Sequence, residues 1–181
     1  MSGESGVLTS GMEIMKGLLR MRALASIASG ALMALLFFGW TATAWAGGSA
    51  GYDPRRDPAA DLRAAVQEAQ RSGKRILLEV GGEWCVWCHV LQDLVTQDKE
   101  VAARLRDGFV IVKVSWSPEN ENTQFLSAYP PIPGYPHFFV LESNGTYLRS
   151  QPVDPFTKGD AYDRAKVLAF LKQWSPPVKK H

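Results

Sequence analysis

The alternation of hydrophobic and polar residues predicts a first helix that starts after a short leader. Asp57 suits the N-cap of this helix, Pro58 its first position, and Gly73 the position just past its end. Apolar residues between these ends recur at helical spacing and form one stripe: Leu62, Ala65, Val66 and Ala69. Residues 47–56 contain Gly and Pro without such a pattern, and we interpret them as a short leader.

Two strands, separated by helical sequence, follow. An apolar run at residues 75–80 ends at two glycines, which is typical of a buried strand. A helix begins at Cys85, and Asp98 provides a new N-cap for residues 99–106. The β-branched run at residues 109–116 predicts the second strand, and a short helix is expected after it.

The last third of the chain predicts a β-hairpin and a closing helix. An Asn-Gly pair separates apolar runs at residues 137–142 and 146–150. Such a pair between two apolar runs is the strongest short-range signal of a hairpin. A loop with two prolines then leads to Asp160 and to a helical apolar pattern that extends to Trp174.

The order of these elements predicts an α/β fold. A strand–helix–strand unit requires a right-handed crossover between parallel strands, and the hairpin adds an antiparallel edge. We therefore expect a small, mixed, four-stranded sheet with helices on both faces. This domain would cover residues 57–174, and residues 175–181 would be a disordered tail.

Residues 1–46 have the pattern of a secretory signal peptide. Basic residues precede a long apolar run, and Ala44 and Ala46 complete an A-x-A cleavage site. We expect cleavage near Ala46 and a periplasmic or otherwise exported mature protein. The alternative is an uncleaved membrane anchor, because the apolar run is nearly long enough to span a bilayer. Translation could also begin at Met15 or Met21.

Composition and cysteine count reduce the number of possible functions. A net charge of +2 without a long basic run gives no electrostatic footprint for nucleic acid, and we expect a monomer with no such partner. The only cysteines are Cys85 and Cys88, and a disulfide between them closes a loop too short to brace the fold. Chemistry is therefore the favoured reason for the pair.

Two short motifs carry a family resemblance. The sequence WCVWC at residues 84–88 follows a strand and opens a helix, and GYP at 134–136 precedes the hairpin. In this order the motifs resemble the thioredoxin-like family, in particular exported bacterial thiol:disulfide interchange proteins with a thioredoxin fold. The resemblance implies a redox-active Cys85–Cys88 disulfide with no other cofactor and no metal. It also implies substrates that are disulfides of proteins or peptides, and a membrane-bound thiol donor.

The position of the cysteines supports the same chemistry independently. A nucleophilic cysteine reacts as a thiolate, and the unpaired amides and dipole at a helix N-terminus stabilise a thiolate. Cys85 is at this N-terminus, and Cys88 lies one turn later and is expected to be more buried. Cys85 is thus predicted to attack the substrate and Cys88 to resolve the mixed disulfide.

The resemblance assigns supporting roles to five further residues. Pro136 would be a cis-proline that presents the backbone of Tyr135 to a peptide substrate, unless it is an ordinary trans turn residue. Glu79 would be a buried acid of raised pKa that exchanges a proton with the resolving cysteine, unless it points to solvent from an edge strand. Trp84 and Trp87 would form an apolar rim for substrate, although either could serve only in packing.

Three other interpretations compete with this one. With His89 the motif becomes C-x-x-C-H, the attachment motif of c-type haem, but a second axial ligand would have to be His137 or His181 because the mature chain has no methionine. A zinc site would need His89 and His137 beside the two cysteines. A non-catalytic binding module or chaperone with the same fold is the third.

The direction of the redox reaction depends on the residues around the thiols. Val86 and Trp87 stand between the cysteines, and neither donates a charged hydrogen bond to a thiolate. Strong oxidants of this class have an unusually stabilised reduced form. We therefore expect a reductase rather than an oxidase, although His89, if protonated, would stabilise a thiolate.

Overall fold

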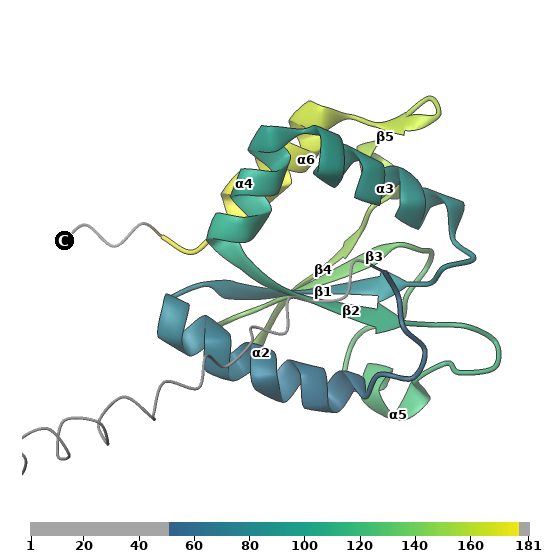
Figure 1. The fold of residues 1–181 in the computed structure, drawn as a ribbon, viewed down its shortest axis with the longest axis vertical. Coiled ribbons are helices and arrows are strands. Elements are labelled where there is room, and N and C mark those ends of the chain that lie inside the picture. Colours follow the sequence, from purple (N-terminus) through teal and green to yellow (C-terminus); the bar gives the residue numbers. More distant parts are fainter. Residues whose placement is uncertain (1–50, 178–181) are drawn as a thin grey trace, which may run out of the picture. The chain divides into compact units, whose positions relative to one another are not determined.

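The computed structural model describes residues 51–177 (Figure 1). The predicted signal peptide and most of the predicted tail lie outside these residues. A four-stranded sheet with the strand order β2-β1-β3-β4 forms the centre of the described unit. The elements are, in chain order, α2 (Pro58–Ser72), β1 (Arg75–Gly81), α3 (Val86–Gln97), α4 (Lys99–Gly108), β2 (Phe109–Ser115), α5 (Thr123–Leu126), β3 (His137–Leu141), β4 (Tyr147–Pro152), η1 (Asp154–Phe156), β5 (Thr157–Lys158), β6 (Ala161–Tyr162) and α6 (Arg164–Trp174).

The sheet is mixed, as the sequence predicts. Strand β1 pairs parallel with β2 and antiparallel with β3, and β3 pairs antiparallel with β4. The predicted hairpin joins β3 to β4, and Gly145 adopts a φ of 88° in its turn. This left-handed conformation is open to glycine without steric cost, which explains the strength of the Asn-Gly signal.

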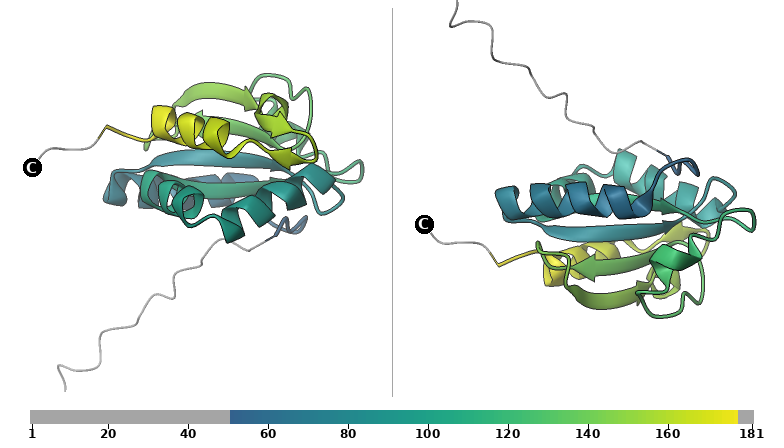
Figure 2. Two further views of the ribbon diagram at one scale, coloured as in Figure 1. Left: turned by 90° about the horizontal axis from the view of Figure 1, so that it is seen from above. Right: turned by 90° about the horizontal axis from the view of Figure 1, so that it is seen from below.

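Helices cover both faces of the sheet (Figure 1 and Figure 2). Helices α3, α4 and α6 lie over one face, and α2 with the short α5 lies over the other. Because side chains alternate along a strand, Ile76, Leu78 and Val80 of β1 join the core under α2. Leu77 joins the core under the other three helices, and Glu79 is oriented toward this same face.

Capping residues set the ends of the helices that hold the site. The Asp57 carboxylate accepts a hydrogen bond from the Ala59 amide, and Gly73 ends α2 in the left-handed conformation. Asp98 ends α3 and caps α4, because its carboxylate accepts from the amides of Glu100 and Val101. These are the caps that the sequence predicts.

The structure differs from the sequence-based expectation after β4. Two-residue strands β5 and β6 form a small hairpin with Gly159 at a φ of 64° in its turn. Helix α6 begins after Asp163, whose carboxylate accepts from the next helix amides, and not after Asp160. Strands this short carry no periodic pattern, and both aspartates suit an N-cap, so the sequence did not separate them.

Within residues 51–177, no helix has the length and apolar character needed to cross a membrane.

Candidate redox site

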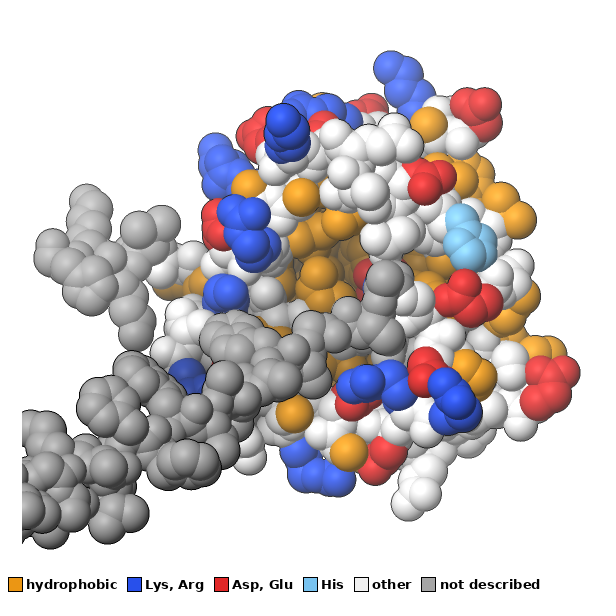
Figure 3. Space-filling model, in the orientation of Figure 1, with side chains coloured by type: hydrophobic (Ala, Val, Ile, Leu, Met, Phe, Trp, Pro, Cys, Tyr) orange, Lys and Arg blue, Asp and Glu red, His pale blue; other side chains and the backbone are white. Residues whose placement is uncertain are grey.

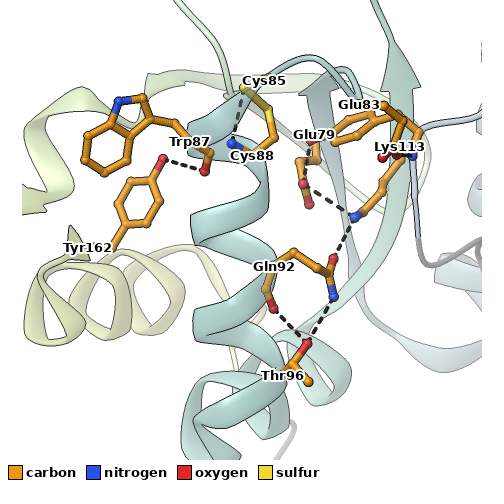
Figure 4. A network of polar contacts seen from close by, with 10 residues as sticks. Glu79, Glu83, Cys85, Trp87, Cys88, Gln92, Thr96, Lys113 and Tyr162 are labelled. Carbon is orange, nitrogen blue, oxygen red and sulfur yellow. Dashed lines mark hydrogen bonds and ion pairs between the residues drawn. A yellow bond between two sulfur atoms is a disulfide. The ribbon is translucent and has the colours of Figure 1, made fainter. Parts of the chain in front are cut away.

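The two cysteines lie where β1 leads into α3. Cys85 is the N-cap of α3, and its sulfur accepts a hydrogen bond from the Cys88 amide over 3.2 Å. The two side chains form a disulfide at the end of the helix (Figure 4). Both residues are almost fully buried, at 4% exposure for Cys85 and 2% for Cys88. Burial therefore differs less between them than expected, and position on the helix is what distinguishes their chemistry.

Glu79 lies beneath the cysteines and is buried, as the sequence predicts. It is on β1, an interior strand of the sheet, and its exposure is 8%. Its Oε1 atom accepts a hydrogen bond of 2.6 Å from the Tyr52 hydroxyl and lies 3.8 Å from Nζ of Lys113. The carboxyl group thus has one polar partner from the N-terminal segment and one from β2.

A line of polar side chains extends from Glu79 along α3. Lys113 also donates a hydrogen bond of 2.7 Å to Oε1 of Gln92, and the Gln92 amide nitrogen donates to Oγ1 of Thr96 over 3.3 Å. Figure 4 shows these residues between α3 and the sheet. Glu79 and Lys113 are register partners on adjacent parallel strands, which places both side chains on the α3 face.

Tyr52 is a site residue that sequence analysis missed. It falls in the segment interpreted as a leader, yet it is only 5% exposed and packs in one cluster with Cys85 and Cys88. Burial, followed by the nearby Glu79 carboxylate, raises the pKa of the Tyr52 phenol well above its usual value. A single aromatic residue in a stretch without periodicity gives no signal of burial, so the pattern could not have found it.

Aromatic residues surround Trp84 next to the start of α3. Its side chain is 52% exposed, and its Nε1 donates a hydrogen bond of 2.7 Å to the Trp116 carbonyl. Trp116 in turn stacks on Tyr135 at 4.8 Å between ring centroids. In Figure 3, hydrophobic side chains also gather at the right-hand edge, the end of the sheet at which the loops after β1 and β2 lie in Figure 1.

Trp87, in the first turn of α3, packs against Tyr162. Its ring meets that of Tyr162 edge-on at 5.4 Å, and the Tyr162 hydroxyl donates to the Trp87 carbonyl over 3.3 Å. Trp87 is partly buried, whereas Val86 is 72% exposed. The exposed apolar surface at the start of α3 is therefore made by Trp84 and Val86, whereas Trp87 packs against Tyr162 and the core.

The segment before β3 brings the predicted proline to the site. The Tyr135–Pro136 peptide bond is cis, and Pro136 is buried. Tyr135 contacts Trp84 edge-on at 5.6 Å between ring centroids. The next residue, His137, is fully buried, and its Nε2 lies 2.7 Å from the Ser150 hydroxyl.

His89 lies at the surface of α3 rather than against the sulfurs. Its Nε2 atom is 2.7 Å from the backbone carbonyl oxygen of Glu83. Among residues 51–177 no group of three or more His, Cys, Asp or Glu side chains is arranged to hold a metal ion. In the described part of the chain, neither His89 nor His137 therefore joins the two cysteines in such a group.

Comparison with known proteins agrees with this geometry. A family model described as Thioredoxin-like matches residues 57–143. The thiol:disulfide interchange protein DsbD of Pseudomonas sp. (strain JR1 / K1) is 30% identical over 126 residues, which are 70% of this chain and 20% of that protein. The chain spans about a fifth of the length of the DsbD proteins that it matches.

Two further proteins extend the comparison. Disulfide bond reductase DsbH of Chlamydia pneumoniae is 26% identical over 116 residues, 60% of this chain and 69% of that protein. The solved structure of a disulphide isomerase from Xylella fastidiosa Temecula1 covers 67% of this chain and 94% of its own, with a TM-score of 0.58 and 23% identity. This second likeness bears on the fold alone. Motif and family model coincide on residues 57–143, and this part of the chain therefore belongs to the thioredoxin-like family.

Proposed function

We propose that the protein is a thiol:disulfide oxidoreductase of the cell envelope that reduces disulfides in exported proteins. The observation that carries the proposal is the Cys85–Cys88 pair at the start of α3, in a cluster against which Tyr135 packs. The names of the relatives, a thiol:disulfide interchange protein and a disulfide bond reductase, support the same reaction class.

The reaction would proceed by two exchanges at sulfur. In the reduced protein the Cys85 thiolate attacks one sulfur of the substrate disulfide, forms a mixed disulfide and releases the other sulfur as a thiolate. Cys88 then attacks Cys85, closes the Cys85–Cys88 bond and releases the second substrate thiolate. Two electrons pass from the dithiol to the substrate, and a membrane-bound thiol donor would return two electrons for the next cycle.

The surface around the thiols suits a flexible apolar segment of substrate. Trp84 and Val86 are exposed at the helix end, and Tyr135 packs against Trp84. Large aromatic surfaces bind apolar side chains with little loss of conformational entropy. The backbone of Tyr135, next to the cis bond, would pair with the extended substrate chain.

The local chemistry favours the reducing direction. The Cys85 sulfur receives a neutral backbone hydrogen bond from the Cys88 amide, and the His89 ring contacts a carbonyl oxygen instead. A neutral donor stabilises a thiolate less than a charged one does. We expect a potential near the value of about −270 mV of thioredoxin rather than the value of about −120 mV of a strong periplasmic oxidant.

An insulin-reduction assay with a small thiol as electron source tests the proposed function. Wild-type protein should accelerate insulin reduction, and Cys85→Ser should abolish the acceleration. Cys88→Ser is the matched control, because it keeps the attacking thiol and should accumulate a mixed disulfide with substrate. Equal rates for wild type and Cys85→Ser would favour the binding-module interpretation, and a Soret band in purified protein would favour haem attachment.

Equilibration with glutathione buffers tests the direction separately. A potential above about −160 mV, well toward the oxidising end of the family range, would contradict a reductase while leaving the exchange chemistry intact.

A further inference from the structure

Tyr52 contacts both Glu79 and the cluster of residues that holds the predicted resolving cysteine. It donates a hydrogen bond of 2.6 Å to Oε1 of Glu79. The same tyrosine packs against Cys85 and Cys88 in one buried cluster. Tyr52 lies in neither of the sequence motifs that define the site, and it comes from a segment that precedes the first helix.

The Tyr52 hydroxyl and the Cys88 sulfur both border the space above Gly81. A Cβ atom on Gly81 would stand 2.5 Å from Sγ of Cys88 and 2.8 Å from Oη of Tyr52. Both atoms therefore border the same small space above Gly81, which only glycine leaves open to them. The hydroxyl group that is bonded to the Glu79 carboxylate thus borders the same space as the sulfur.

We propose that the Tyr52 hydroxyl relays a proton between the Cys88 thiol and the Glu79 carboxylate. In the resolving step the Cys88 S–H bond breaks and its proton passes to the Tyr52 oxygen, while the Tyr52 proton passes to Oε1 of Glu79. The Cys88 thiolate then attacks Cys85 and displaces the substrate thiolate, which takes a proton from water. The proposal rests on the proposed function, because it describes the second half of the same reaction.

The electrostatic surroundings of Tyr52 favour a relay over an ionised intermediate. The charged and titratable groups that face the phenol are Glu79, Glu83 and Tyr162, and Nζ of Lys113 lies 5.0 Å from the centre of its ring. Burial and the acidic neighbours raise the pKa of the phenol well above 10. The hydroxyl therefore gains one proton as it loses the other, without forming a phenolate.

A second contact fixes the tyrosine at the site. The Tyr52 amide donates a hydrogen bond of 2.6 Å to Oε1 of Glu83, in the loop that joins β1 to α3. The hydroxyl at the far end of the side chain is held by Glu79 on β1. The backbone and the hydroxyl of Tyr52 are therefore both held by residues of β1 and of the loop after it.

Replacing Tyr52 by phenylalanine tests the relay, because the ring stays and only the hydroxyl is lost. The reduced protein is mixed with a nitrobenzoate disulfide whose released thiol absorbs visible light. The first release reports attack by Cys85, and the second reports resolution by Cys88. We expect Tyr52→Phe to keep the first phase within about twofold and to slow the second by roughly tenfold, since positioned acid–base groups contribute at least this much.

Two companion variants separate a relay from a structural effect. Glu79→Gln should slow the same phase, and Tyr52→Phe should add little in the double variant, because the two groups act in one chain. Tyr162→Phe is the matched control, since it also removes a buried hydroxyl and its hydrogen bond, to Trp87. Its second phase should keep the wild-type rate and pH profile.

The outcomes distinguish this proposal from the proposed function. A normal second phase in Tyr52→Phe, or an equal slowing in Tyr162→Phe, would overturn the relay while wild-type protein still reduces the disulfide. Failure of wild-type protein to release either thiol would instead overturn the proposed function. A flattened pH profile of the second phase in Tyr52→Phe, at unchanged thermal stability, would support the relay.

Discussion

At the scale of single residues, the Glu79–Lys113 pair shows how the sheet register builds the site. The two side chains oppose each other because their residues are register partners, and both are largely buried. Removing one member of a buried pair leaves the other charge uncompensated, which costs more than replacing both. Lys113 also contacts Gln92, so its loss removes the connection between β2 and α3 as well.

Lys113→Met should therefore destabilise the protein by about 3 kcal/mol, the cost of an uncompensated buried charge. The double variant Lys113→Met with Glu79→Gln should recover part of this loss, because no carboxylate then remains without its partner. Urea unfolding of wild type and the three variants measures the effect. A double variant no more stable than Lys113→Met alone would show that the pair does not interact in this way.

Because His137 is buried, we expect the protein to lose stability in acid. Burial lowers its pKa from 6.5 to about 4, and its Nδ1 has no hydrogen-bond partner in the described structure. Between pH 6.5 and 4 the unfolded chain binds a proton on this histidine that the folded protein does not bind. The contribution of His137 to the free energy of unfolding is therefore complete above pH 6.5, and it decreases as the pH drops toward 4.

The variant His137→Phe checks this dependence, because it keeps an aromatic ring beside Phe139 and removes the titration. From pH 6.5 to 4 it should lose less stability than wild type, by up to about 3 kcal/mol. Ser150, the hydrogen-bond partner of His137, is only partly buried and can bond to water instead. Identical acid-unfolding curves for both proteins would rule out this histidine as the cause.

At the scale of elements, the start of α3 is the basis for predicting which cysteine attacks. Cys85 is the N-cap and Cys88 lies in the first turn, although their exposures are nearly equal. The partial positive charge of a helix N-terminus acts most strongly on the capping group. We therefore expect selectivity between the two thiols to come from their positions on the helix and not from access.

Alkylation of the reduced protein against pH measures this selectivity. The Cys85 thiol should have a pKa below the usual value of about 8.5 and should react faster than the Cys88 thiol. The single variants Cys85→Ala and Cys88→Ala report each thiol without the other. Faster alkylation of Cys88 would reverse the assigned roles.

Elements also show what the sequence predicted and what it did not. The four strands of the main sheet, α2 with its caps, and the division between α3 and α4 at Asp98 follow from periodicity and capping residues. The hairpin of β5 and β6 has two-residue strands, too short for any period. Its packing of Tyr162 against Trp87 depends on tertiary contact and could not be predicted from local sequence.

At the scale of the whole molecule, the candidate site joins segments that are distant in the chain. The cysteines, Glu79 and Pro136 carry motif or family signals and were predicted from the sequence. Tyr52 and Lys113 carry none, because their roles come from the pairing of β1 with β2 and from the N-terminal segment. Sequence reasoning therefore found the cysteine pair and Glu79, and missed the two residues that contact the Glu79 carboxylate.

The location of the mature protein remains a prediction at this scale. The sequence predicts cleavage near Ala46, which would leave Tyr52 in the mature chain six residues later. Intact mass of protein recovered from the cell envelope should correspond to a chain that begins near Gly47. A mass that retains residues 21–46 would indicate a membrane anchor instead.

The position of Lys113 on β2 has a consequence for solubility. Strand β2 forms one edge of the sheet, and its sequence FVIVKVS is β-branched and apolar except for this lysine and the final serine. An unpaired edge of this kind can pair with the same strand of another molecule, and an inward-pointing charge opposes such pairing. The residue that neutralises Glu79 would thus also protect the protein against aggregation, and selection on either property would preserve it.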